Sequence, residues 1–228
     1  MNNKVLVHHL GLGDHIICNG LVRNTLLNFD YILYYPVKFH NIENVKRMFD
    51  DVIDRIKIVP VIGDEDMLEY ASGFNPSSVI ATGIFNNNWA SVQGSFCEKF
   101  YKQVLVDPSE RWSSFFIPEV KTDILYSYAG QNVFLHQDTS RNLTIKDSYI
   151  KENTYSPRHS LGSLSKYTIF DYLPILERVD EIHCIDSSFA CFIDHCQTLK
   201  DKKKYIHRYV RENNENPKYI NNWEILYE

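Results

Sequence analysis

The chain lacks long apolar runs and an excess of basic residues, and each absence excludes a class of protein. No apolar run approaches the roughly 18 residues that a membrane-spanning helix needs, so we expect no membrane span. The first residues reach charged and histidine side chains at once without a small-residue cleavage site, so we expect no secretory leader. A formal net charge of −5 argues against broad nucleic-acid binding, which requires a basic surface. We therefore expect a cytoplasmic enzyme or binding protein.

The cysteines also show little organisation. There are 5, an odd number, and none forms a CxxC pair, so a disulfide framework is not indicated. Cys191 and Cys196 flank His195, a spacing that could supply part of a metal site. A zinc site needs about four ligands, however, and no second cluster completes one. We expect no metal and no cofactor.

What the sequence does contain is an alternation of apolar strand-like segments with amphipathic helix-like segments. The expected strands cover 4–10, 31–37, 55–61, 78–84, 132–136, 143–145, 181–185 and 204–209, and the expected helices cover 16–27, 41–51, 64–72, 91–106, 170–179 and 189–199. Such alternation favours parallel sheets covered by helices. We predict an α/β protein with two small Rossmann-like halves, residues 1–110 and 120–228, facing across a cleft. A turn-forming linker is expected within 107–122.

The first candidate site is the turn Gly11-Leu12-Gly13-Asp14-His15, between the first strand and its helix. Ligands of open parallel sheets bind beyond the carboxyl ends of the strands, where this turn would lie. A dinucleotide fingerprint would need a third glycine in place of Ile16 and an acidic residue ending the second strand, and both are missing, so NAD is not favoured. Asp14 then either caps the helix or acts on a ligand that the glycines let approach.

The second candidate site is Asp186-Ser187-Ser188-Phe189, where another apolar strand ends and a helix begins. The first backbone N–H groups of a helix and its positive dipole end favour phosphate, and two serine hydroxyls add donors there. The alternative is that Asp186 or Ser187 only caps the helix.

The third candidate site is the loop from His136 to Asn142, which also follows a strand. Arg141 offers a planar fork that suits phosphate oxygens, and His136 offers a further donor. The alternative is a solvated loop with a surface arginine. Arg208 and Arg211, after a later strand, indicate only a solvated strand end.

At these residues the chain resembles sugar-nucleotide glycosyltransferases of the GT-B fold, above all the heptosyltransferase-like group of glycosyltransferase family 9. The turn at Gly11–Asp14 looks like the family's Gly-x-Gly-Asp turn, whose aspartate acts as general base on the acceptor hydroxyl. The segment Ile185–Phe189 is similar to the family's diphosphate-holding segment and to the Ser-Ser/Thr-Phe segment of fucosyltransferases. The loop His136–Arg141 stands where fucosyltransferase-like enzymes carry a basic donor-binding strand end.

The resemblance implies a metal-independent inverting glycosyltransferase that moves a sugar from a nucleotide sugar to a glycan or other hydroxyl acceptor. The implied site residues are the base Asp14, the acceptor-side residues Gly11, Gly13 and His15, and the donor-binding residues His136, Arg141, Asp186, Ser187, Ser188 and Phe189. The chain departs from the family at Ser188, where a glycine is usual, and at Cys191 and Phe192, where a histidine is expected. These departures favour the alternative, a non-catalytic module that binds a nucleotide or glycan.

Overall fold

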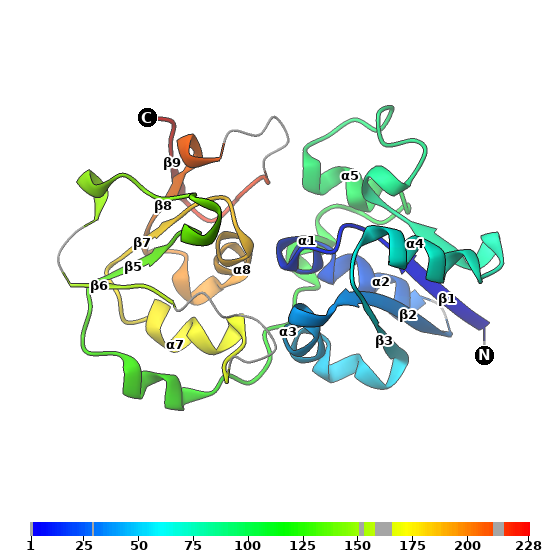
Figure 1. The fold of residues 1–228 in the computed structure, drawn as a ribbon, viewed down its shortest axis with the longest axis horizontal. Helices are drawn as coiled ribbons and strands as arrows, with labels where there is room; N and C mark the ends of the chain where they lie inside the picture. Colours follow the sequence, from blue (N-terminus) through cyan, green and yellow to red (C-terminus); the bar gives the residue numbers. More distant parts are fainter. Residues whose placement is uncertain (1, 29, 151–152, 158–165, 212–216) are drawn as a thin grey trace. The chain divides into compact units, whose positions relative to one another are not determined.

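The chain forms two compact units, Met1–Pro118 (unit 1) and Glu119–Glu228 (unit 2). The computed structural model describes residues 2–28, 30–150, 153–157, 166–211 and 217–228. Each unit contains one wholly parallel sheet with helices packed around it (Figure 1), which confirms the predicted α/β class with two Rossmann-like halves. The predicted cleft between the halves stays a prediction. No described helix has the length and apolar character that crossing a membrane requires.

Unit 1 contains a sheet with the strand order β3-β2-β1-β4. Its strands are β1 (Asn2–Val7), β2 (Tyr31–Lys38), β3 (Ile56–Val61) and β4 (Val79–Ala81), and its helices are α1 (Leu12–Ile17), α2 (Asn19–Asn28), α3 (Ile42–Met48), α4 (Asp64–Ser72), α5 (Phe96–Lys102) and α6 (Glu110–Ser113). β1 lies between two partners, and its residues Val5, Leu6 and Val7 are all buried. Consecutive buried residues are expected in a parallel strand that is covered on both faces.

Three segments of unit 1 differ from the sequence prediction. The helix expected at 16–27 is two helices, α1 and α2, separated at Cys18. The helix expected at 91–106 is only α5, because Ser95 and Glu98 form a capping box at its start. The expected linker contains α6, which packs closely on α2: a Cβ atom at Gly20 would lie 1.9 Å from the carbonyl oxygen of Glu110.

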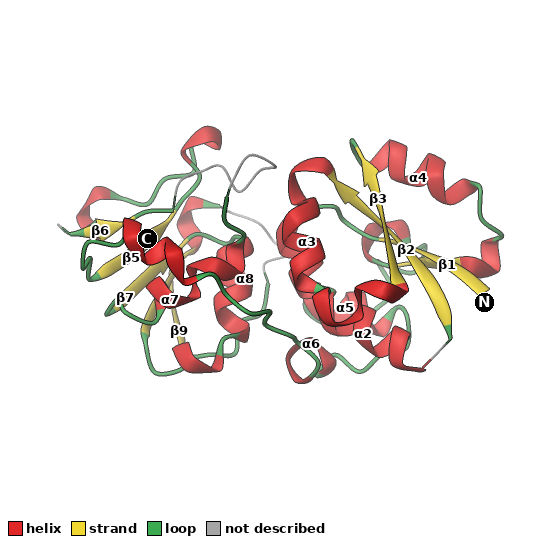
Figure 2. Ribbon diagram, turned by 90° about the horizontal axis from the view of Figure 1, so that it is seen from below, coloured by secondary structure: helices red, strands yellow, loops and turns green. Residues whose placement is uncertain are grey.

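Unit 2 contains a sheet with the strand order β6-β5-β7-β8-β9. Its strands are β5 (Val133–His136), β6 (Thr154–Tyr155), β7 (Glu181–Cys184), β8 (Lys203–His207) and β9 (Trp223–Leu226), and its helices are α7 (Leu173–Leu176) and α8 (Ser188–His195). Helix α8 is buried along almost its whole length, and Figure 2 shows it beside this sheet. Because α8 is packed along its length, its first turn is held in a fixed place relative to the ends of the strands.

The edges of this second sheet were not predicted. No strand forms at 143–145; instead an isolated bridge between Asp138 and Leu143 closes the loop after β5. β6 forms within 153–162, which reads as turn-rich, and β9 follows the Asn-rich stretch 212–222. Parts of both stretches, 158–165 and 212–216, lie outside the described residues. β9 is held by Asp194 of α8, which accepts a hydrogen bond from the Trp223 indole at 3.1 Å.

The two strand orders locate the edge at which a ligand is expected. In a parallel sheet, ligands bind at the carboxyl ends of the strands, where the strand order reverses direction. In unit 1 this point lies between β1 and β4, and in unit 2 it lies between β5 and β7. The second and third candidate sites of the sequence follow β7 and β5, so the fold of unit 2 brings them to one place.

Candidate functional site

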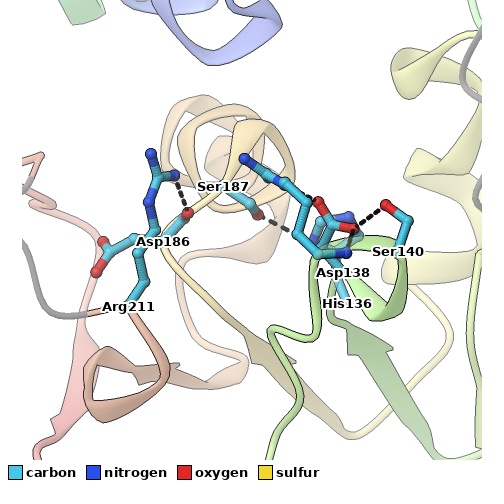
Figure 3. A network of polar contacts seen from close by, with 7 residues as sticks. His136, Asp138, Ser140, Asp186, Ser187 and Arg211 are labelled. Carbon is cyan, nitrogen blue, oxygen red and sulfur yellow. Dashed lines mark hydrogen bonds and ion pairs between the residues drawn. The ribbon is translucent and has the colours of Figure 1, made fainter.

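Ser187 and His136 join the ends of β5 and β7 in unit 2. The register pairs His136 with Cys184, so the two strands end side by side. Ser187 Oγ lies 3.0 Å from His136 Nδ1 and also accepts the backbone N–H of Ala190, which makes Ser187 the N-cap of α8 (Figure 3). Ser187 therefore caps the helix, as one of the two interpretations of this segment expects, and it also contacts a second candidate residue. Phosphate binding at this segment stays a prediction.

The first turn of α8 carries backbone N–H groups and two serine hydroxyls, and the helix beneath them is buried. Ser187 and Ser188 are half-buried, whereas Phe189 is fully buried and its ring lies 4.5 Å from the ring of His136. The first N–H groups of a helix have no partner within the helix, and the dipole places a partial positive charge there. The two serines are thus accessible to a ligand. The buried Phe189 ring packs against the His136 ring and holds its orientation.

The loop after β5 is organised around Asp138. Its carboxylate accepts hydrogen bonds from the Ser140 hydroxyl at 2.6 Å and from Nε of Arg141. Burial alone would raise the pKa of Asp138, but the bonds from Ser140 and Arg141 and the arginine charge lower it to about 2. Asn142 closes the turn in the left-handed region, at φ 57°. The Arg141 side chain is exposed, and its Nε is held by Asp138. Within the described part of the chain, no group bonds its terminal nitrogens.

Asp186 is buried and accepts hydrogen bonds from Arg208 and Arg211, which follow β8. Its carboxylate accepts from Arg208 Nε at 3.2 Å and from the Tyr219 hydroxyl at 3.0 Å. Its carbonyl oxygen accepts from Arg211 Nη1 at 3.2 Å. Figure 3 shows this contact on one side of Ser187 and the His136–Asp138–Ser140 group on the other. Arg211 is thus a further candidate at this edge, which the sequence indicates only as a solvated strand end.

Taken together, the edge of unit 2 carries hydroxyls, an imidazole, two guanidinium groups and a helix N-terminus. The two nearby carboxylates, Asp138 and Asp186, are each already bonded to arginine. Groups of this kind bind an anion with several oxygens, such as a phosphate ester. Across residues 2–28, 30–150, 153–157, 166–211 and 217–228, no three His, Cys, Asp or Glu side chains are gathered in a way that could hold a metal ion.

The first candidate site, in unit 1, is helical and not a loop. Gly13 and Asp14 are the second and third residues of α1, and Asp14 is half-buried. A Cβ atom at Gly11 would lie 2.6 Å from Asp14 Oδ2, so the space that Gly11 leaves is occupied by the carboxylate of Asp14 itself. His15 is buried, with Nδ1 3.0 Å from the Tyr35 hydroxyl, and is therefore an interior residue.

His9 is a further candidate at the β1/β4 edge of unit 1. It is half-buried, packs against Phe85 and Phe100, and its Nε2 lies 3.4 Å from the backbone nitrogen of Ile84. Gly83 adopts φ 72°, and a Cβ atom there would lie 2.6 Å from the His9 ring. The sequence does not predict which of His8 and His9 is accessible, because both follow the end of β1, beyond the apolar pattern of the strand.

Comparison with known proteins adds little to this geometry. No family model matches the chain, and a search of curated proteins finds no match. Among solved structures, it is similar to E. coli heptosyltransferase WaaC with ADP-2-deoxy-2-fluoro heptose, at 12% sequence identity and a TM-score of 0.46, over 99% of this chain and 93% of that chain. The fold assignment therefore rests on the strand orders of the chain itself.

Proposed function

We propose that unit 2 binds the diphosphate of a nucleotide sugar at the carboxyl ends of β5 and β7, and that the chain is a glycosyltransferase. The observation that supports this is that Ser187 and His136 meet at the N-terminus of α8, with Arg211 bonded to the Asp186 carbonyl beside them (Figure 3). Arg141 lies on the loop that follows His136 and is bonded to Asp138. A diphosphate spreads its negative charge over several oxygens, and amide, hydroxyl and guanidinium donors approaching from several sides match that distribution.

The residues divide into those that touch the donor and those that support them. Ser187, Ser188, His136 and the two arginines would bind phosphate oxygens directly. Asp186 would act indirectly by holding Arg211 through its carbonyl oxygen and Arg208 through its carboxylate, and Phe189 by holding the His136 ring, since both side chains are buried. This division refines the sequence prediction, in which Asp186 and Phe189 contact the donor.

The proposed reaction is a single displacement with inversion. Asp14 would accept the proton of an acceptor hydroxyl as that oxygen forms a bond to the anomeric carbon. The bond from that carbon to the diphosphate oxygen breaks, and its electron pair leaves with the nucleoside diphosphate. The charge that develops there would be stabilised by the helix N-terminus and the guanidinium groups, so the step needs no metal. The role of Asp14 rests on the Gly-x-Gly-Asp resemblance.

Calorimetric titration with ADP, UDP, GDP and CDP tests the donor site. At least one should bind saturably, and Arg141→Gln and Arg211→Gln should each weaken that binding about tenfold or more. Arg178→Gln is the matched control, because Arg178 bonds the Pro174 carbonyl on α7 and should leave affinity unchanged. Absence of binding by all four nucleotides, or binding indifferent to both site variants, would refute the proposal.

The second candidate function, a non-catalytic binding module, is favoured by the buried Cys191 and Phe192, which stand where a histidine is expected. Release of nucleoside diphosphate from nucleotide sugars separates the two. A transferase should release it in the wild type and lose well over tenfold of that rate in Asp14→Asn, with nucleotide affinity retained. A binding module should release none in either protein.

A further inference from the structure

Four side chains of unit 2 form a continuous series across the sheet, which we name the imidazole chain: Glu181, His183, His207 and Tyr209. The Tyr209 hydroxyl lies 3.1 Å from His207 Nδ1 and accepts the backbone N–H of Lys146 at 3.1 Å. His207 Nε2 lies 2.8 Å from His183 Nδ1. His183 Nε2 lies 3.7 Å from Glu181 Oε2. Both rings are buried, so water does not substitute for these contacts.

The hydrogen bonds of this chain have one direction when both rings are neutral. The Glu181 carboxylate only accepts, so the proton of His183 belongs on Nε2, facing it. His183 Nδ1 is then an acceptor, which requires a proton on His207 Nε2. His207 Nδ1 is in turn an acceptor and takes the hydroxyl proton of Tyr209. The donors of Tyr209 and His207 then face acceptors at hydrogen-bond distance, whereas the Nε2 proton of His183 faces the Glu181 carboxylate at 3.7 Å, beyond that distance. The Tyr209 oxygen retains a lone pair for the Lys146 amide.

The chain ends on the loop that carries Arg141. Lys146 follows that arginine by five positions, and its ammonium lies 4.7 Å from the centre of the Tyr209 ring. Ile145 is buried against the sheet, and the Tyr149 ring lies 4.8 Å from that of His207. The far end of the loop is therefore fixed by Tyr209 and His207, while its near end is fixed by β5.

We propose that the imidazole chain is a positioning device for the Arg141 loop, and that uptake of one proton reverses its direction. The inference rests on the proposed donor site for its effect on ligand binding, but not for the hydrogen-bond direction. In the reversed chain, His183 carries protons on both nitrogens and donates from Nδ1 to His207 Nε2. His207 then carries its proton on Nδ1 and donates to the Tyr209 oxygen, whose own hydrogen must turn away. The Lys146 amide then shares that oxygen with a second donor.

The surroundings keep His207 neutral near pH 7. The groups that face it are Glu181, Lys203 (which pairs with Glu181 at 3.6 Å), Tyr205 stacked on His183, and Tyr149, Tyr209 and Lys146 around the His207 end. Burial, and secondarily the neighbouring His183, lower the pKa of His207 to about 4. His207 should therefore be neutral near pH 7, which the unreversed direction requires.

Imidazole ¹⁵N NMR of the full chain tests the direction without any ligand. At pH 7 both His183 and His207 should carry their proton on Nε2. On acidification toward pH 4 the proton of His207 should move to Nδ1. A His207 proton already on Nδ1 at pH 7, or two rings that titrate independently, would overturn the inference.

Tyr209→Phe tests the positioning role. The Lys146 amide should exchange with solvent at least tenfold faster, and the affinity for the nucleoside diphosphate that binds the wild type should fall severalfold. Tyr205→Phe is the matched control, because it removes a hydroxyl from a ring on β8 for which the described residues show no hydrogen bond. Unchanged exchange at Lys146 in Tyr209→Phe would overturn the positioning role, whereas faster exchange without nucleotide binding in any protein would leave it standing and refute only the donor site.

His207→Gln keeps one donor and one acceptor but does not titrate. It should retain the protection of the Lys146 amide, that is, its exchange rate relative to the intrinsic rate at the same pH, and lose the acid dependence of that protection between pH 7 and pH 4. Retention of the wild-type pH profile in this variant would contradict the role of the histidine pair.

Discussion

Each unit buries a pair of histidines beside its sheet, and the two pairs are built in opposite ways. In unit 1 the rings of His8 and His15 lie 4.7 Å apart in a T-shaped contact. Both nitrogens of His8 and Nε2 of His15 have no hydrogen-bond partner within the described residues. In unit 2 the rings of His183 and His207 share a hydrogen bond, and His207 also contacts the Tyr209 hydroxyl. The remaining nitrogen, His183 Nε2, faces Glu181 at 3.7 Å, beyond hydrogen-bond distance.

The difference teaches that burial alone does not make a histidine functional. Burial lowers the pKa of His8 to about 3, so this ring is neutral and packs as an aromatic side chain. His207 is equally buried, but each of its nitrogens has an assigned partner, and removing the ring would leave those partners unsatisfied. The first pair should tolerate apolar replacement, and the second should not.

The largest expected effect is the loss of stability of unit 1 in acid. The unfolded chain binds a proton at His8 below about pH 6.5, whereas the folded chain does not until about pH 3. Stability is therefore complete above pH 6.5 and falls by about 1.4 kcal/mol per pH unit for this group as pH decreases. Urea denaturation followed at amide signals of unit 1 measures how the free energy of unfolding changes with pH. His8→Leu should reduce that slope by the contribution of one proton, about 1.4 kcal/mol per pH unit. An unaltered slope in His8→Leu would show that the ring is not the source.

The next largest effect is the loss of stability when a histidine of unit 2 is replaced by leucine. His207→Leu should lower the free energy of unfolding by about 1–3 kcal/mol at pH 7, because it leaves His183 and Tyr209 without partners in a buried setting. His8→Leu at pH 7 should be close to neutral. Equal losses in the two variants, measured by denaturation of each, would abolish the distinction between the pairs.

The two strand-to-helix turns differ as well, with a smaller effect. Ser187 caps α8 through its side chain, whereas Gly11 at the start of α1 makes no such bond. Ser187→Ala should therefore destabilise unit 2 by about 1 kcal/mol. Thermal unfolding followed at unit 2 signals measures this loss, and an unchanged midpoint would mean that the cap is not formed.

The smallest effect concerns Gly11. Gly11→Ala should cost only a few tenths of a kcal/mol, because the atom in its way is the end of the flexible Asp14 side chain. The carboxylate of Asp14 should nevertheless move, which a chemical shift change at its ¹³Cγ would reveal. A large loss of stability without movement of Asp14 would contradict this packing.

In unit 2 the sequence predicted which strand ends carry the candidate residues better than it predicted the contacts of those residues. Strands that end at His136 and near Ile185 are readable from their apolar runs, and parallel strands bring such ends to one edge. The partners of Asp186 were not readable, because Arg208, Arg211 and Tyr219 reach it from a different strand end and from the tail.

Unit 1 was misread where a short helix began early. The helix was expected from residue 16, but α1 starts at Leu12 and turns His15 into the interior against Tyr35. The start of a helix that lacks a side-chain cap leaves no sequence signal to place it. The same limit concealed α6, which lies within the expected linker and packs on Gly20 of α2.

The most direct test of the account is to map nucleoside diphosphate binding on both units by amide chemical shifts. The account predicts saturable shifts at Ser188, at His136 and at Arg141, with no comparable group of shifts around His9 and Gly83 at the edge of unit 1. Saturable shifts confined to unit 1, or none with any of the four nucleotides, would contradict the claim that the β5/β7 edge holds a diphosphate.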